Sequence, residues 1–185
     1  MRSARTLLLV VAGLSLLPLL AGCSGKKQTL SDCPVRPTPI ERFSLCLTDG
    51  WRASTEQMGT AGSIIVSIKP ANNSGTLMQI HVKKDPLQED IGSSMEFAER
   101  AVAITRQQAP HYVAVGTEPM TIAGEQTLLH TFDATPDPKQ PPVRYYQFVT
   151  TNAGIGYGFT AVISPKADAD MKEVLLAILK SARFL

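Results

Sequence analysis

Apolar and polar side chains alternate along several short segments, a pattern typical of strands with one buried face. In residues 76–83, the apolar side chains Met78, Ile80 and Val82 alternate with polar ones. We expect the polar set of this segment, which includes His81, to face outward. Further strand-like segments cover residues 43–47, 63–69, 126–133, 143–150 and 155–163. Turn-forming residues separate them at 48–51, 70–75, 121–124 and 151–154.

Two other segments have the period of an amphipathic helix. Ser93 is a capping residue with Glu96 three positions later, and Pro110 marks the end of this first helix. The second helix is expected to open at Ser164 with Pro165 at its first helical position. The apolar stripe of the first helix comprises Phe97, Ala98, Ala101, Val102, Ile104 and Thr105. That of the second comprises Met171, Val174, Leu175, Ile178, Leu179 and Ala182. These elements predict an α+β domain, a mostly antiparallel sheet with two helices.

The first residues read as an export signal rather than as part of this domain. Arg2 and Arg5 precede an apolar stretch at residues 7–20, which is short for a membrane-spanning helix. Leu20-Ala21-Gly22-Cys23 follows, and this sequence closely resembles a bacterial lipobox. The resemblance implies attachment of lipid to Cys23 and cleavage just before it. The alternative is an ordinary secretory signal in which the cysteine is incidental.

The lipobox divides the chain into three parts. Residues 1–22 are predicted to be a signal peptide, residues 23–40 a lipidated tether, and residues 41–185 a single folded domain. The chain has 185 residues, with 18 Lys and Arg against 16 Asp and Glu. The excess positive charge comes from the two arginines before Cys23, so the rest of the chain is formally neutral. We therefore expect no binding to nucleic acid.

Two cysteines remain if Cys23 carries lipid. Cys33 and Cys46 form an even pair in a protein that is predicted to be exported, and disulfides persist in oxidising compartments. We expect a disulfide between Cys33 and Cys46, which would stabilise the fold by about 3 kcal/mol in the chain-entropy model. Two unpaired thiols are the alternative.

The order of elements also resembles a known fold. The residues that carry the likeness are Phe43-Ser44-Leu45 before Gly50-Trp51, then Met120 to Gln126, Gly156 to Thr160 and Ser181 to Phe184. They are similar to the PsbP/Mog1-like fold, and most of all to DcrB-like bacterial lipoproteins and the mycobacterial LpqN/LpqT lipoproteins. The resemblance implies an antiparallel sheet flanked by helices in an α-β-α sandwich. It also implies a non-enzymatic protein, and the family offers no catalytic residues to carry over.

Candidate chemistry is sparse along the chain. The three histidines, His81, His111 and His130, have no second His or Cys at the spacing of a metal site. No Gly-x-Ser-x-Gly motif marks a nucleophile. Gly154, Gly156 and Gly158 are interpreted as close packing rather than as a nucleotide loop. We therefore expect no metal, no cofactor and no catalytic site, with a hydrolase as the weaker alternative.

Three features are candidates for binding. Tyr145, Tyr146 and Tyr157 are expected to be exposed aromatic residues in the C-terminal hairpin. The loop at 134–142 is rich in proline, and its Pro138 and Pro141 extend this candidate surface. The third candidate, a groove between sheet and helix, is implied by the chaperones among the related proteins.

Together these features predict a non-catalytic lipoprotein of the cell envelope. It would be anchored through Cys23 and would bind an unidentified envelope protein as an accessory or assembly factor. Ser24 after the cysteine favours an outer membrane, with the domain facing the periplasm, if the organism has two membranes. We expect a monomer. The alternative function is an envelope carrier that holds a small apolar ligand or lipid between sheet and helix.

Overall fold

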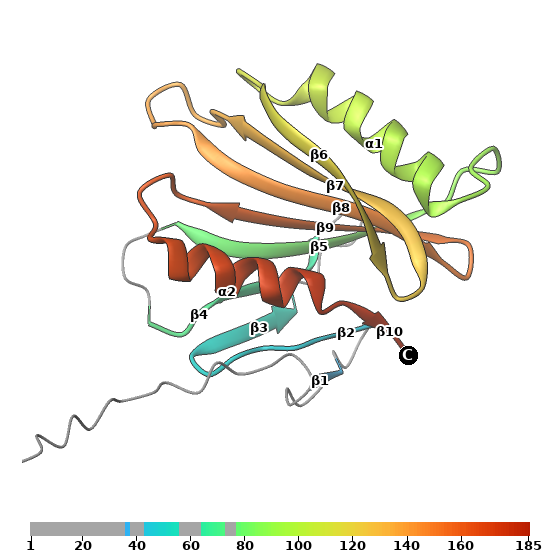
Figure 1. Ribbon diagram of the computed structural model, residues 1–185, viewed down its shortest axis with the longest axis horizontal. Coiled ribbons are helices and arrows are strands. Elements are labelled where there is room, and N and C mark those ends of the chain that lie inside the picture. The colour runs from blue at the N-terminus through green and yellow to red at the C-terminus, as the bar shows by residue number, and fades with distance from the viewer. Residues whose placement is uncertain (1–35, 38–42, 56–63, 73–76) are drawn as a thin grey trace, which may run out of the picture.

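A seven-stranded antiparallel sheet forms the centre of the molecule in the order β3-β4-β5-β9-β8-β7-β6 (Figure 1). The structure is a computed structural model that describes residues 36–37, 43–55, 64–72 and 77–185. The strands of the large sheet are β3 (Trp51–Thr55), β4 (Ile64–Pro70), β5 (Met78–Pro86), β6 (Val113–Ile122), β7 (Glu125–Ala134), β8 (Val143–Asn152) and β9 (Ile155–Ile163). A smaller antiparallel sheet joins β1 (Arg36–Pro37), β2 (Phe43–Leu45) and β10 (Arg183–Phe184).

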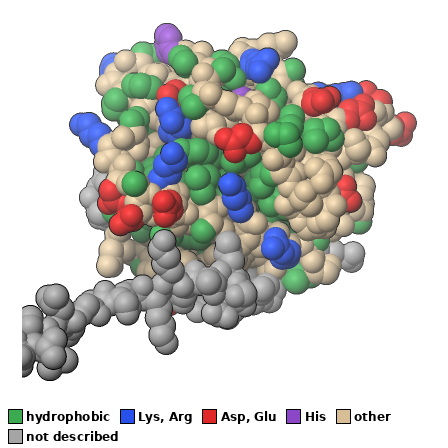
Figure 2. Space-filling view, in the orientation of Figure 1, with side chains coloured by type: hydrophobic (Ala, Val, Ile, Leu, Met, Phe, Trp, Pro, Cys, Tyr) green, Lys and Arg blue, Asp and Glu red, His purple; other side chains and the backbone are tan. Residues whose placement is uncertain are grey.

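One helix lies on each face of the large sheet (Figure 1). Helix α1 (Ser94–Gln108) packs on β7 and β8, whereas α2 (Ala169–Lys180) packs on β9 and β5 from the other side. The predicted α+β fold with helices flanking an antiparallel sheet is therefore confirmed. Figure 2 shows basic and acidic side chains interspersed on one face of the molecule.

The main core lies between the sheet and α2. Phe159 is fully buried there, stacked on Phe148 with ring centroids 4.7 Å apart. Phe43 of β2 meets the edge of Phe159 at 5.4 Å, so the small sheet closes the core beside α2. Leu175 and Leu179 supply the face of α2 that completes it. Burial of these large apolar side chains is the dominant stabilising contribution.

Several elements have the buried faces and turns that local sequence patterns predicted. Met78, Ile80 and Val82 are all buried, whereas their neighbours in β5 are more exposed. The two long hairpins turn at Ala-Gly pairs with positive φ, at residues 123–124 and 153–154. Such pairs suit the tight turns that match the twist of antiparallel strands. The predicted stripe of α2 is also confirmed at Leu175, since that residue is fully buried.

Helix starts follow local hydrogen bonds that the sequence only partly revealed. Ser93 caps α1, since its side chain accepts the Glu96 N–H at 3.1 Å. The Glu96 carboxylate accepts from Gly92 rather than from Ser93, so the reciprocal half of the capping box is absent. The start predicted at Ser164 for α2 is wrong. Asp168 caps that helix and accepts the Met171 N–H at 2.7 Å.

Three other sequence-based expectations differ from the structure. The strand-like segment predicted at 126–133 belongs to a longer hairpin, since β6 and β7 are ten residues long each. Strand β6 is exposed almost throughout, so it lacks the alternation that marks a half-buried strand, and its edge position tolerates Pro119. Trp51 was placed in a turn but begins β3. On α1, Ala98 and Val102 are buried, whereas Ile104 is 45% exposed.

Candidate binding site

The face of the sheet that carries α1 bears a row of polar residues at matching positions. Ser67 on β4 is opposite His81 on β5, which is opposite Thr160 on β9. Thr160 is in turn opposite Gln147 on β8, which is opposite His130 on β7. We call these five residues the cross-strand row. They occupy the positions that alternate with the core side chains, so they point away from α2.

Hydrogen bonds join neighbours along the cross-strand row. Ser67 Oγ and His81 Nδ1 are 3.1 Å apart, and Gln147 Nε2 donates to Thr160 Oγ1 at 3.3 Å. Thr105 of α1 donates its hydroxyl to Gln147 Oε1 at 3.2 Å. Gln147 therefore has its carbonyl occupied, and its amide orientation is set by contacts on both sides.

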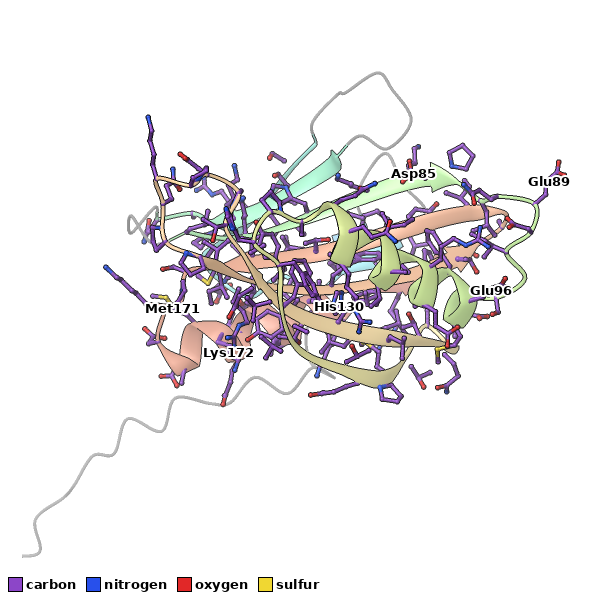
Figure 3. The ribbon with its side chains drawn as sticks, turned by 90° about the horizontal axis from the view of Figure 1, so that it is seen from above. Asp85, Glu89, Glu96, His130, Met171 and Lys172 are labelled. Carbon is purple, nitrogen blue, oxygen red and sulfur yellow. The ribbon has the colours of Figure 1, made fainter. Side chains whose placement is uncertain are left out.

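His130 ends the cross-strand row close to α1 (Figure 3). It is 2% exposed, and its Nε2 shares a 2.9 Å hydrogen bond with the Tyr112 hydroxyl. Its Nδ1 has no hydrogen-bond partner among the described residues. Burial, together with the positive charge of Arg106, lowers the pKa of His130, so the ring is neutral at pH 7. Among the described residues, only one of the two ring nitrogens of His130 therefore has a hydrogen-bond partner.

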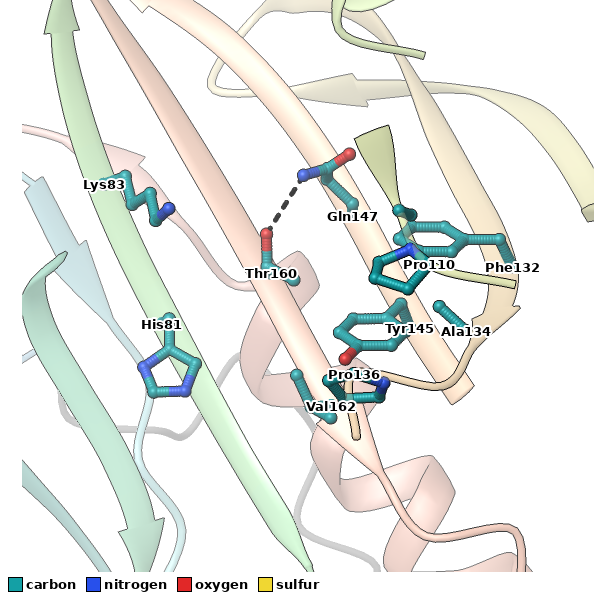
Figure 4. A pocket seen from close by; sticks show the side chains of 11 residues that line it. His81, Lys83, Pro110, Phe132, Ala134, Pro136, Tyr145, Gln147, Thr160 and Val162 are labelled. Carbon is teal, nitrogen blue, oxygen red and sulfur yellow. Dashed lines mark hydrogen bonds between the residues drawn. The ribbon is translucent and has the colours of Figure 1, made fainter. Parts of the chain in front are cut away.

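A cavity of about 310 Å³ opens beside the middle of the cross-strand row (Figure 4). Thr160 and Val162 of β9 form its floor, between β5 on one side and an apolar wall on the other. His81 and Lys83 lie on the β5 side. The opposite wall comprises Ala109, Pro110, Phe132, Ala134, Pro136 and Tyr145. The cavity therefore has one cationic side and one apolar side.

Stacked aromatic rings support the apolar wall. The rings of Phe132 and Tyr145 are 4.8 Å apart and nearly parallel, and His130 stacks on Phe132 at the same distance. Tyr145 is partly buried, and this burial raises the pKa of its phenol. Its hydroxyl therefore stays protonated at neutral pH and is available as a hydrogen-bond donor.

A groove of about 590 Å³ continues from the cavity along the flank of α1. Lys83, Gln147 and Thr160 line both spaces. The α1 side of the groove includes Phe97 and the exposed Ile104. The groove exists because α1 packs on β7 and β8 and leaves the β5 side of the same face uncovered.

The structure divides the three predicted surface tyrosines between opposite faces of the sheet. Tyr145 lines the cavity, but Tyr146 and Tyr157 are 5% and 2% exposed and belong to the core on the α2 side. Their expected exposure is therefore wrong. In β8, Tyr146 shares its face with buried Phe148, and this alternation within residues 143–150 already assigned Tyr145 and Tyr146 to opposite faces. Tyr157 packs its ring on Phe184 at 5.1 Å.

The proline-rich loop at 134–142 borders the cavity. Pro136 lines it, while Pro138 and Pro141 are exposed. Asp137 organises the loop, since its carboxylate accepts the Lys139 N–H at 2.9 Å. The two prolines of the predicted surface are thus accessible and belong to the same loop as one wall of the cavity.

The remaining predicted sites lie wholly or partly outside the described residues. Cys23 and Cys33 are both outside, so lipid attachment and the Cys33–Cys46 disulfide stay predictions. Cys46 is buried, and its backbone N–H donates to Ser181 Oγ at 2.8 Å. Within the described ranges, no group of three or more His, Cys, Asp or Glu residues could hold a metal ion. No helix in that part of the chain has the length and apolar character needed to cross a membrane.

Gly156 confirms the close-packing interpretation of the glycine-rich strand. A Cβ built on Gly156 would lie 2.7 Å from the ring of Phe97 on α1. A Cβ on Gly158 would meet only Val149, at an ordinary 3.8 Å. Gly154 has a φ of +77° and lies in the hairpin turn. Only Gly156 is therefore required by the contact between helix and sheet.

Comparisons with known proteins identify the fold. No family model and no curated protein matches the sequence. Among solved structures, the chain is similar to the cyanobacterial PsbP protein CyanoP of Synechocystis sp. PCC 6803, with a TM-score of 0.56 and 14% identity over 90% of this chain and 99% of that one. It is equally similar to LpqN, which is involved in cell envelope biogenesis in Mycobacterium tuberculosis, with a TM-score of 0.56 and 14% identity over 83% and 93% of the two chains. The fold is therefore PsbP-like, as the order of elements predicted.

Proposed function

We propose that this protein is a non-catalytic lipoprotein of the cell envelope that binds another envelope protein. The lipobox at residues 20–23 supports the anchor. The similar fold of LpqN, a protein of envelope biogenesis, supports the compartment. The observation that supports binding most directly is that the exposed proline loop at 134–142 borders an open cavity. Exposed apolar residues around a concave site suit recognition of a partner.

The cross-strand row also favours binding over catalysis. Ser67 Oγ bonds to His81 Nδ1, which superficially resembles a nucleophile and its base. Ser67 is only 1% exposed, however, so a substrate carbonyl has no approach to its oxygen. We therefore assign these side chains to the floor of a binding surface and propose no hydrolase activity.

Site-specific photocrosslinking in the native host tests the proposal. A photoreactive amino acid replaces Pro138 or Pro141 in the full chain, and exposed Asp170 at the start of α2 serves as the control position. We expect discrete crosslinked species from the two loop positions and none from position 170. The same species should disappear with Cys23→Ala, which removes the anchor. If the loop positions give no more adducts than position 170, the protein-binding proposal is wrong.

Fatty-acid labelling and membrane fractionation separately test the proposed lipid anchor and the proposed compartment. Cys23→Ala should abolish incorporation of labelled fatty acid and release the protein from membranes. In an organism with two membranes, we propose that the labelled protein fractionates with the outer membrane and faces the periplasm. Persistent labelling of Cys23→Ala would contradict the lipobox interpretation. Thiol alkylation with and without reductant tests the proposed Cys33–Cys46 disulfide.

The apolar wall of the cavity favours one alternative, an envelope carrier of a small ligand. Tyr145 is partly exposed and stacks on buried Phe132, so its ring is the aromatic surface that the cavity offers. Native mass spectrometry of the protein purified from its host would show a co-purifying mass in that case. A ligand-free mass in every preparation would leave the carrier alternative without support. Sedimentation of the same purified protein separately tests whether it is the proposed monomer.

A further inference from the structure

Most of the polar side chains that line the cavity can donate hydrogen bonds to a ligand. Among the described residues that line the cavity, Lys83 is the only Lys, Arg, Asp or Glu, and no described residue forms an ion pair with it. Asp85, two residues further along β5, lines the groove rather than the cavity. Among the described residues, the cavity therefore presents a cation and no carboxylate in its lining.

Neighbouring hydrogen bonds leave further donors free on the floor and wall. The Thr160 hydroxyl accepts the Gln147 amide N–H, so its own hydrogen remains available to a ligand. The Gln147 carbonyl is occupied by Thr105, which removes the main competing acceptor from the floor. On the wall, the Tyr145 hydroxyl is a third donor. An occupant that matches Lys83 and Thr160 carries acceptor oxygens on the end that faces β5, whereas the Tyr145 hydroxyl lies on the wall across from them.

The shape of the cavity restricts the rest of the occupant. The Phe132–Tyr145 pair and two prolines form a firm apolar wall across β9 from Lys83 (Figure 4). Flat rings stack well on such a wall, and offset stacking is a favourable arrangement for aromatic pairs. A volume of about 310 Å³ lies at the small end of ligand pockets, so the cavity itself suits a compact molecule, whereas a long acyl chain would have to extend into the groove.

We propose that this cavity is a binding site for a compact aromatic carboxylate. The carboxylate is held by Lys83 and the Thr160 hydroxyl at the β5 side, and the ring packs on Tyr145 and Val162. The proposal requires neither the lipid anchor nor the partner protein. It also changes the ligand class of the carrier alternative from apolar to anionic.

Calorimetric titration of the full chain in zwitterionic lipid nanodiscs tests the proposal, with empty nanodiscs as the blank. The probes are naphthoate and naphthylmethylammonium, which share a ring system but carry opposite charges. We expect saturable binding of naphthoate with one site per chain and no saturable binding of the ammonium compound. Equal binding of both probes, or no saturable binding of naphthoate, would overturn the proposal.

Matched variants locate the site. Lys83→Gln should weaken naphthoate binding about tenfold or more, because it removes a charge-assisted contact. Lys84→Gln is the control, since Lys84 is the next residue on β5 and lines neither the cavity nor the groove. An unchanged affinity in Lys83→Gln, with an unchanged thermal unfolding midpoint, would contradict the assignment.

Variants of the wall test the stacking. Tyr145→Leu should lower the affinity for naphthoate about two- to tenfold through loss of the ring, whereas Tyr145→Phe should retain most of it. Equal loss in both variants would mean that the ring does not stack, and it would overturn the assigned pose. The crosslinking experiment at Pro138 does not involve naphthoate. A negative result for naphthoate binding would therefore leave the partner-protein proposal unaffected.

Discussion

The two faces of the large sheet use neighbouring residues of the same strands in different ways. On the α2 side, Phe159 and Leu175 are fully buried in a closed core to which β2 also contributes. On the α1 side, Thr160 and Lys83 line open spaces, because α1 sits over β7 and β8 and leaves β5 uncovered. Exposed polar side chains on that second face contribute little to stability and are therefore free to bind.

A firm core on one face of the sheet thus supports a polar surface on the other face. Binding groups are most precise when rigid elements hold them, and here the strands of the closed core also carry the cross-strand row. The row is stiffened by bonds between neighbours, such as Gln147 to Thr160. Substitutions on the two faces should therefore separate stability from binding.

The largest expected contrast is between Phe159 and Thr160, adjacent residues that face opposite sides of β9. Phe159→Ala should lower the free energy of unfolding by about 3–5 kcal/mol, because it leaves a large cavity in the closed core. Thr160→Ala should cost about 1 kcal/mol or less, since it removes one partly exposed hydrogen bond. Urea denaturation of both variants measures the difference. Similar losses would mean that the two faces are equally important for stability.

Ser181 tests a polar contact within the closed side. Its hydroxyl accepts the buried Cys46 N–H at 2.8 Å. Ser181→Ala should cost about 1–3 kcal/mol, because the N–H loses its acceptor without access to water. Ser164→Ala is the control, since its hydroxyl bonds to an exposed N–H that water can satisfy. A Ser181→Ala variant as stable as the control in urea would contradict the assigned hydrogen bond.

Gly156 tests the contact between α1 and the open side. Gly156→Ala should destabilise by about 1–2 kcal/mol, because its new methyl group displaces the Phe97 ring. Gly158→Ala, two residues along the same strand, should change stability by about 0.5 kcal/mol or less. Thermal unfolding of both variants provides the comparison. In the double variant Gly156→Ala/Phe97→Ala the new methyl group no longer meets the Phe97 ring, so the double variant should lose less stability than the sum of the two single variants. Losses that simply add would contradict the contact between Gly156 and Phe97.

The smallest expected effect is a pH dependence from His130. Its folded pKa is lowered, first by burial and then by Arg106, so the unfolded chain binds the proton more readily. Its contribution to stability is full above the ordinary histidine pKa of about 6.5, and it decreases as the pH falls toward the lowered value. His130→Gln should flatten this part of the pH profile of unfolding. An identical profile for His130→Gln and the unmodified protein would exclude this origin.

Local signals in the sequence were reliable where the deciding interaction is local. Ser93 caps α1, and the Ala-Gly turns at 123–124 and 153–154 lie where predicted, because each depends on neighbouring residues only. The alternation at 78–82 correctly assigned the buried face of β5. The start of α2 was wrong because Ser164 instead closes a short turn, in which it accepts the Ala167 N–H.

The candidate site depends on contacts between distant parts of the chain. Lys83, Gln147 and Thr160 were not singled out from the sequence, although each occupies a polar position of its strand. Only the register of β5, β9 and β8 brings them together. The buried position of Tyr157 likewise depends on β2, β10 and α2, which come from both ends of the domain.

The sequence by itself therefore determined the fold class, the inward face of β5 and the helix cap at Ser93, and it predicts a location in the cell envelope. The tertiary structure alone decided which part of the sheet α1 leaves open, and so where the cavity lies. The physical reason is that strand alternation and capping are encoded in neighbouring residues. Strand register and helix placement instead depend on the packing of residues far apart in the chain.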